Sequence, residues 1–119
     1  MIRVFLACDD QDYGNKICRQ LQNQRNLVVF PQTEYGIPAI RNAVEFVPDV
    51  VILVASDRDE REITGAVKSS LPDVPVFLVT ERFSLEVEKD ALSSGVEAVF
   101  EKHQDLESLI TNVRAISSL

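Results

Sequence analysis

Cysteine, histidine and basic residues are scarce in this chain. Its 119 residues include two cysteines, one histidine and 12 Lys or Arg against 19 Asp or Glu, a formal net charge of -7. The spacing of Cys8 and Cys18 matches neither a zinc site nor a redox CxxC pair, so we interpret both as buried thiols. Binding to nucleic acid is disfavoured, because neutralising phosphates requires clustered positive charge.

Long hydrophobic runs are also missing. The longest, Val50 to Ala55, is far short of the roughly 20 residues of a membrane-spanning helix. The N-terminus has no basic stretch leading into a cleavable apolar segment, and no internal repeat occurs. Glycine-rich phosphate loops, nucleophile elbows and metalloprotease motifs are absent, so nothing indicates an enzyme. We expect a cytoplasmic protein folded as one domain over residues 1–119.

What the sequence does contain is a regular alternation of two patterns. Apolar runs rich in β-branched and aromatic residues predict buried strands at 1–7, 26–30, 50–55, 75–79 and 96–100. Helical periodicity predicts helices at 11–24, 34–46, 58–71, 84–94 and 105–117, with Ser84 as an N-cap and Gly95 as a left-handed C-terminal residue. Strict strand–helix alternation predicts an α/β fold, a doubly wound five-stranded parallel sheet with helices on both faces.

In such sheets, function collects outside the carboxyl ends of the strands. The residues that the pattern places there are Asp9, Asp10, Val54, Ser56, Thr80 and Lys102.

Over essentially its whole length the chain resembles the receiver domains of two-component response regulators. That family has an acidic pair after strand one, Pro-Asp before an apolar strand that ends in the phosphorylated aspartate, Thr or Ser after strand four, and Lys after strand five. The matching residues are Asp9-Asp10, Pro48-Asp49, Thr80 and Lys102. The resemblance implies a CheY-like, flavodoxin-type three-layer sandwich with strand order 2-1-3-4-5.

The resemblance also implies a role in two-component or phosphorelay signalling. The expected partner is a kinase or effector domain, docked on the face formed by helix four, strand five and helix five. The protein itself is expected to be a monomer or a weak homodimer that binds neither nucleic acid nor membrane.

The family spacing places Val54 at the phosphate-acceptor position. Valine has no nucleophile, and in the family the acceptor carboxylate is also a Mg²⁺ ligand. We therefore predict a degenerate phosphorylation site at Val54, Thr80 and Lys102. Asp9, Asp10 and the Ser56 carbonyl would form a vestigial metal site, weak or empty, with no other cofactor. The prediction is a pseudo-receiver that acts by protein–protein contact.

Two further departures from the family pattern surround Lys102. His103 replaces the usual proline, which predicts a trans peptide at this point. Val99 replaces the usual aromatic residue three positions before the lysine, and Phe100 is expected to face the opposite side. We predict that Lys102 pairs with Asp9 or Asp10 in place of the missing metal and phosphate.

Several alternatives remain open. Asp57 could be an unorthodox acceptor, although it starts about 10 Å beyond Val54 on the other side of the strand. Cys8 could carry phosphate, but Asp9 and Asp10 would raise the pKa of its thiol and repel phosphate. Asp9 and Asp10 could simply cap a helix, and His103 is more simply an exposed loop residue. The chain could also be the N-terminal part of a larger protein, such as a pilus-assembly ATPase.

Overall fold

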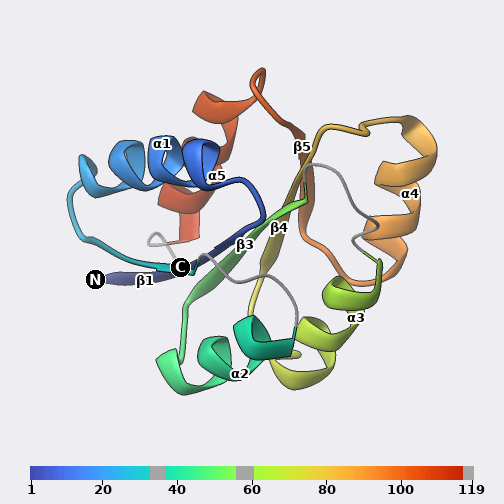
Figure 1. Ribbon diagram of the computed structural model, residues 1–119, viewed down its shortest axis with the longest axis horizontal. Coiled ribbons are helices and arrows are strands. Elements are labelled where there is room, and N and C mark those ends of the chain that lie inside the picture. Colours follow the sequence, from blue (N-terminus) through green and yellow to red (C-terminus); the bar gives the residue numbers. More distant parts are fainter. Residues whose placement is uncertain (33–36, 56–60, 117–119) are drawn as a thin grey trace.

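A parallel sheet of five strands forms the middle layer of the protein (Figure 1). The computed structural model describes residues 1–32, 37–55 and 61–116. The strands are β1 (Ile2–Cys8), β2 (Leu27–Gln32), β3 (Val50–Ala55), β4 (Val76–Thr80) and β5 (Ala98–Glu101), in the order β2-β1-β3-β4-β5. The predicted fold class and strand order are confirmed.

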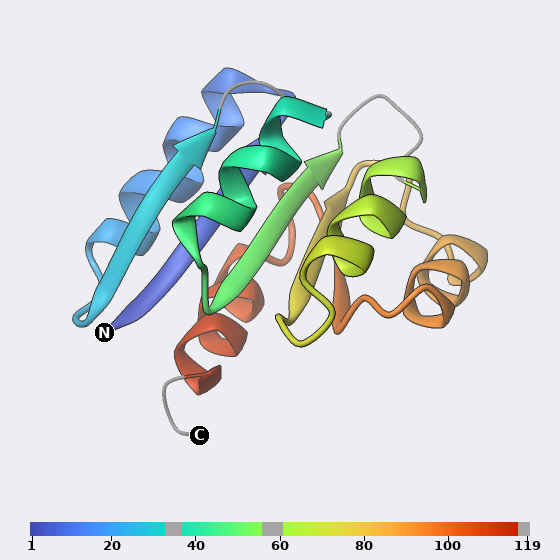
Figure 2. The same cartoon turned by 90° about the horizontal axis from the view of Figure 1, so that it is seen from below.

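Five helices cover the two faces of this sheet (Figures 1 and 2). They are α1 (Gln11–Gln22), α2 (Ile37–Phe46), α3 (Arg61–Ser70), α4 (Leu85–Ser93) and α5 (Leu106–Ile116). Helices α1 and α5 lie on one face, and α2, α3 and α4 lie on the other. In the described part of the chain no helix is long and apolar enough to cross a membrane.

The central strand β3 contributes to two hydrophobic cores. All six of its residues are buried, as expected for a strand covered on both faces. Ile52 and Val54 belong to the core beneath α1 and α5, whereas Val51 and Leu53 belong to the core beneath α2 and α3. Burial on both sides explains why this strand is the most continuously apolar segment of the sequence.

The Pro48-Asp49 pair has a structural role at the start of β3. The Asp49 carboxylate accepts a hydrogen bond from the Arg3 backbone N–H at 2.8 Å, and the Asp49 N–H donates to the Arg3 carbonyl at 2.8 Å. These reciprocal bonds tie β3 to β1. They set the register in which Cys8 lies opposite Val54 at the far end of the two strands.

The helix termini follow the predicted capping residues where the structure describes them. Ser84 caps α4 by accepting from the Val87 N–H at 3.1 Å, and Gly95 after that helix has a left-handed φ of 99°. Asp10 caps α1 by accepting from the Tyr13 N–H at 3.2 Å. The predicted starts of the second and third helices lie outside the described residues.

Candidate functional site

The carboxyl ends of the parallel strands bring most of the predicted site residues to the same edge of the sheet. Asp9 and Asp10 follow β1, Val54 lies near the end of β3, Thr80 ends β4, and Lys102 follows β5. The Lys102 N–H donates to the Thr80 carbonyl at 2.9 Å, so β5 continues beside β4 up to this edge. Ser56, the remaining predicted member, lies outside the described residues, as does Asp57.

Val54 is buried completely at this edge of the sheet. It pairs with Cys8 of β1 and Val79 of β4, and all three belong to the core beneath α1 and α5. The Asp9 N–H donates to the Val54 carbonyl at 3.3 Å, which places the acceptor position next to the acidic pair. The side chain there is an isopropyl group, which offers no oxygen to a metal or a phosphoryl group.

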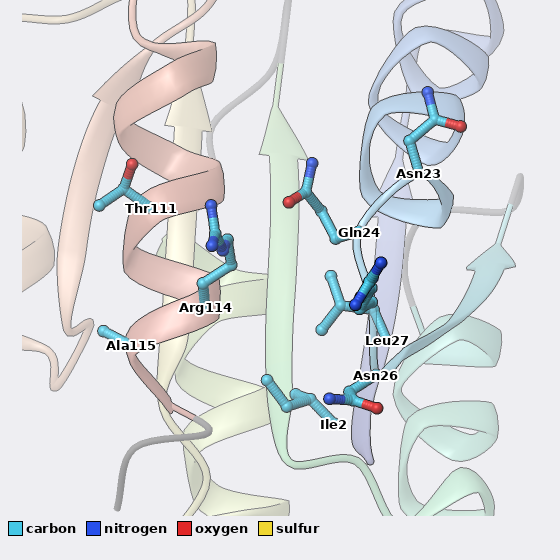
Figure 3. Close-up of a pocket in the computed structure, with 9 residues that line it drawn as sticks. Ile2, Asn23, Gln24, Asn26, Leu27, Thr111, Arg114 and Ala115 are labelled. Atoms are coloured by element: carbon cyan, nitrogen blue, oxygen red, sulfur yellow. The ribbon is translucent and has the colours of Figure 1, made fainter.

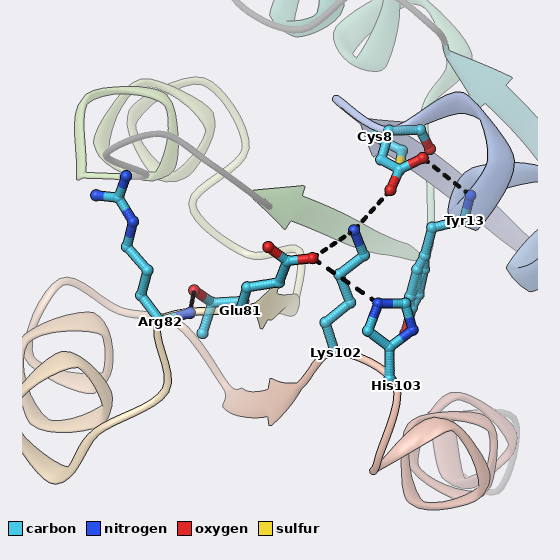
Figure 4. A network of polar contacts seen from close by, with 8 residues as sticks. Cys8, Tyr13, Glu81, Arg82, Lys102 and His103 are labelled. Carbon is cyan, nitrogen blue, oxygen red and sulfur yellow. Dashed lines mark hydrogen bonds and ion pairs between the residues drawn. The ribbon is translucent and has the colours of Figure 1, made fainter.

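Lys102 is the centre of the polar network in Figure 4. Its Nζ lies 2.7 Å from Asp10 Oδ2 and 3.0 Å from Glu81 Oε1, and 4.9 Å from the centroid of the Tyr13 ring. The lysine side chain is 1% exposed, whereas the side chains of Asp10 and Glu81 are 37% and 44% exposed. The predicted pairing of Lys102 with the acids after β1 is therefore present through Asp10. The second carboxylate, Glu81, was not predicted.

The network keeps Asp10 and Lys102 charged. The hydrogen bond from Lys102 and then the one from the Tyr13 N–H lower the pKa of Asp10 below its ordinary value. Burial acts to lower the pKa of Lys102, but its hydrogen bonds to Asp10 and Glu81 outweigh burial and raise that pKa. The site consequently holds a buried, protonated ammonium group whose positive charge is balanced by carboxylates of the protein itself.

Thr80 orders the loop that carries Glu81. Its side chain is buried, and Oγ1 accepts a hydrogen bond from the Arg82 N–H at 3.0 Å. Because Glu81 lies between these two residues, the bond fixes the direction in which Glu81 leaves β4. Thr80 thus supports the Glu81–Lys102 contact from the backbone side.

His103 occupies the turn after β5. Its side chain is 61% exposed, as predicted, and its ring stacks on Tyr13 with a centroid distance of 5.1 Å. Nε2 lies 3.8 Å from Glu81 Oε1. The peptide bond before His103 is trans. The backbone of His103 is left-handed, with a φ of 74° that a proline ring cannot adopt. The substitution of histidine for the family's proline therefore goes with a different backbone.

The prediction for strand β5 is confirmed as well. Phe100 is buried in the core beneath α1 and α5, edge-on to Phe77 with a centroid distance of 5.7 Å. Val99 faces the other core. No aromatic ring is therefore present at the position where the family usually carries one.

Cys8 lies beneath the network as an inert thiol. Burial is the largest cause that raises its pKa to about 11, and the negative charges of Asp9 and Asp10 raise it further. The predicted direction is confirmed, although burial outweighs the acidic neighbours that were expected to cause it. Sγ donates to the Asp10 carbonyl at 2.9 Å. A protonated, buried sulfur is a poor nucleophile, which argues against phosphate transfer through Cys8.

The described residues do not fit the Mg²⁺ site that the family resemblance implies. Within residues 1–32, 37–55 and 61–116 there is no group of three or more His, Cys, Asp or Glu side chains that could hold a metal ion. Asp10 Oδ2 binds Lys102, and Asp10 Oδ1 caps α1. The carboxylate that the family places on β3 is replaced by Val54.

A surface pocket at the opposite end of the sheet is separate from this network (Figure 3). Ile2 and Leu27 contribute apolar surface to it, and Arg25 and Arg114 contribute positive charge. Arg114 lies in the last turn of α5, where a cation is stabilised by the helix dipole. The described residues that line it include no carboxylate, thiol or imidazole.

Comparison with known proteins identifies relatives among response regulators. No family model matches the chain. It is 28% identical over 115 residues to the response regulator protein VraR of Staphylococcus saprophyticus, covering 95% of this chain and 55% of the relative. The chain therefore spans about half the length of the curated relatives it matches.

Solved structures of receiver domains share the fold. A two-component response regulator of the LuxR family from Aurantimonas superposes with a TM-score of 0.88 at 18% identity, covering 99% of this chain and 86% of the other. A chain described as a pilus assembly protein from Burkholderia thailandensis superposes with a TM-score of 0.79 at 16% identity, covering all of both chains. The chain is thus similar in sequence to response regulators and has the fold of solved receiver domains.

Proposed function

We propose that this chain is a response-regulator receiver domain that signals by protein–protein contact, without phosphorylation at the usual position and without catalytic activity of its own. One observation carries the proposal: the fully buried isopropyl group of Val54 occupies the place where the family resemblance requires a carboxylate. Phosphoryl transfer to a receiver needs an oxygen nucleophile at that point, and an alkyl side chain cannot supply one.

The surrounding residues support the same conclusion. Lys102, which in the family meets the phosphoryl oxygens, binds Asp10 and Glu81. Thr80, the other phosphoryl contact in the family, accepts from the backbone of the loop after β4. Each group left over from a phosphorylation site thus makes contacts within the protein. The conformation of the domain would then be set by a partner rather than by aspartyl phosphate.

The face formed by α4, β5 and α5 is the proposed contact surface. Leu85 and Leu92 on α4 are 80% and 46% exposed. They are seven residues apart, so they lie on the same side of the helix. Exposed leucines that share one side of a helix are suited to an apolar contact with a signalling partner, a kinase or an effector domain.

Intact mass measurement tests the proposal directly. The protein is incubated with acetyl phosphate and Mg²⁺ beside a conventional receiver domain as positive control, and the expected result is no phosphate adduct on this chain. The Asp57→Asn variant is run in parallel, with Asp49→Asn as a matched control. A stoichiometric adduct that disappears only in Asp57→Asn would overturn the proposal and identify Asp57 as an unorthodox acceptor.

A further inference from the structure

We propose that the pocket at the amino-terminal end of the sheet is a binding site for a small organic anion, with a doubly charged oxyanion head on an apolar body. A phosphate monoester is the simplest ligand of this class. The site lies in the groove between the turn after α1 and the last turns of α5 (Figure 3). The inference goes beyond the proposed function, which involves no bound ligand.

The pocket has the size and the apolar floor of a small-molecule site. Its volume is about 670 Å³, within the range of roughly 300 to 1,000 Å³ that is typical of ligand pockets. Ile2 at the start of β1 belongs to the core beneath α1 and α5, and Leu27 at the start of β2 packs against that core. This apolar part of the lining can cover the carbon skeleton of a ligand.

The charged part of the lining is positive only. Arg114 comes from α5 and Arg25 from the turn before β2, so guanidinium groups reach the groove from both of its walls. The described residues that line it include no Asp or Glu, although the chain as a whole has a formal charge of -7. Guanidinium groups bind phosphate through pairs of parallel hydrogen bonds. A phosphate monoester, with about two negative charges at neutral pH, matches the two arginines.

The helix dipole accounts for only one of these two arginines. Arg114 stands in the last turn of α5, where a cation is favourable in any case. Arg25 lies outside the helices, its side chain is exposed, and it takes part in no contact with the described residues. The carboxyl ends of α1 and α5 contribute about half a negative charge each. Two full positive charges outweigh them, so the groove attracts an anion.

The turn that carries Arg25 is fixed by backbone hydrogen bonds. The Ile2 N–H donates to the Asn26 carbonyl at 2.7 Å, and the Gln24 N–H donates to the Leu21 carbonyl at 3.0 Å. Asn26 has a left-handed φ of 66°, a conformation that asparagine adopts more readily than most residues. Both neighbours of Arg25 are therefore held in place, and this wall of the groove needs little backbone ordering when a ligand binds.

Nuclear magnetic resonance titrations of the isotope-labelled protein at constant ionic strength test the site. The probes are phenyl phosphate, which has both the oxyanion head and an apolar body, inorganic phosphate, which has the head alone, and phenol, which has the body alone. We expect phenyl phosphate to shift the amide signals of residues 23–27 and 111–115 saturably. Its half-saturating concentration should be about tenfold lower than that of either fragment.

Two of these outcomes would overturn the proposal. One is the absence of saturable shifts at residues 23–27 and 111–115 with phenyl phosphate. The other is half-saturation by inorganic phosphate at the same concentration as by phenyl phosphate, which would mean an adventitious ion only.

Arg25→Gln is the main variant, because no contact with the described residues is lost with this side chain. It should raise the half-saturating concentration of phenyl phosphate roughly tenfold, the effect of about one charge-assisted hydrogen bond. Arg114→Lys keeps a cation at the end of α5 but loses the planar fork, so it should weaken binding as well.

Arg41→Gln is the matched control, since it removes an exposed arginine from α2 on the other face of the sheet. It changes the net charge by the same amount as Arg25→Gln and should bind phenyl phosphate like the parent. Equal weakening by Arg25→Gln and Arg41→Gln would show that net charge rather than the groove attracts the anion, and the proposal would fail.

Discussion

At the residue scale, the stability of the site depends more on the carboxylates around Lys102 than on the lysine charge itself. Lys102 is buried, whereas the carboxylates that bind it reach solvent. Removing the lysine leaves two anions that water can hydrate. Removing the negative charges leaves an ammonium group that water cannot reach. The two kinds of substitution should therefore have unequal effects on stability.

We expect Lys102→Met to change the free energy of unfolding by no more than about 1 kcal/mol, because methionine fills a similar volume without a desolvation cost. The double variant Asp10→Asn/Glu81→Gln should lose about 2 kcal/mol, less than for a fully buried pair because solvent reaches both carboxylates. Asparagine keeps the N-cap of α1. Urea unfolding with and without Mg²⁺ measures both effects. A larger loss for Lys102→Met, or a strong Mg²⁺ dependence, would contradict this account.

Protonation of Asp10 should contribute to the loss of stability of the protein at acid pH. The hydrogen bond from Lys102 lowers the pKa of Asp10 in the folded state. The ionised Asp10 carboxylate therefore contributes its full stabilisation of the folded protein above the unfolded-state pKa of about 4. This stabilisation is lost as the pH falls through the lower folded-state pKa. Urea unfolding between about pH 6 and pH 3 should show a steeper loss for the parent than for Asp10→Asn. Parallel curves would show that Asp10 does not contribute.

The two cysteines should differ in reactivity. Burial raises the pKa of Cys8 to about 11, and burial also raises the pKa of the half-buried Cys18. At neutral pH we expect a thiol reagent to modify Cys18 slowly in the folded protein and Cys8 only after unfolding. Mass spectrometry of the labelled peptides distinguishes them. Rapid labelling of Cys8 would mean that the β1 end is more open than the structure shows.

At the element scale, α4 begins at a single well-defined cap. The Ser84 hydroxyl accepts from the Val87 N–H, and no other described side chain satisfies that amide. We expect Ser84→Ala to lower the free energy of unfolding by about 1 kcal/mol, while Ser84→Asp, which can still cap, should restore it. Thermal unfolding measures this. Equal melting temperatures for parent and Ser84→Ala would show that the cap adds no stability.

The strands were predictable from the sequence because each forms an apolar run, and the runs are most continuous in β1, β3 and β4, which are buried on both faces. The ends of the strands were harder to predict. Strand β2 extends to Gln32, beyond the predicted end at Phe30, and includes Pro31. A proline is tolerated there because β2 is an edge strand. Strand β5 begins at Ala98 rather than Val96, since apolar character alone does not mark where pairing with β4 starts.

Only those site residues that lie at the ends of strands could be predicted from the sequence. The ends of β1, β3, β4 and β5 placed Asp10, Val54, Thr80 and Lys102 correctly. Glu81 was missed, because the direction of a side chain in a loop depends on bonds such as that from the Arg82 N–H to Thr80, which no periodic pattern encodes. The sequence feature that could have pointed to Glu81 is its position as an acidic residue directly after Thr80.

At the scale of the whole molecule, net charge limits the partners. The chain carries a formal charge of -7, and duplex DNA repels such a surface unless basic residues cluster. We expect no binding of this chain to duplex DNA at physiological salt, and no binding on lowering the salt. Fluorescence anisotropy with a labelled duplex measures this. Salt-dependent binding in the micromolar range would contradict the prediction that contact with proteins is its mode of action.

The left-handed turn at His103 bears on how this chain could change over evolution. A mutation of Val54 to aspartate would return an acceptor oxygen, yet the chain after β5 would keep a backbone that proline cannot follow. A proline introduced at position 103 by itself would force that turn to rebuild while the acceptor was still missing. Neither substitution alone would therefore give the chain both the carboxylate on β3 and the backbone after β5 that the family pattern implies.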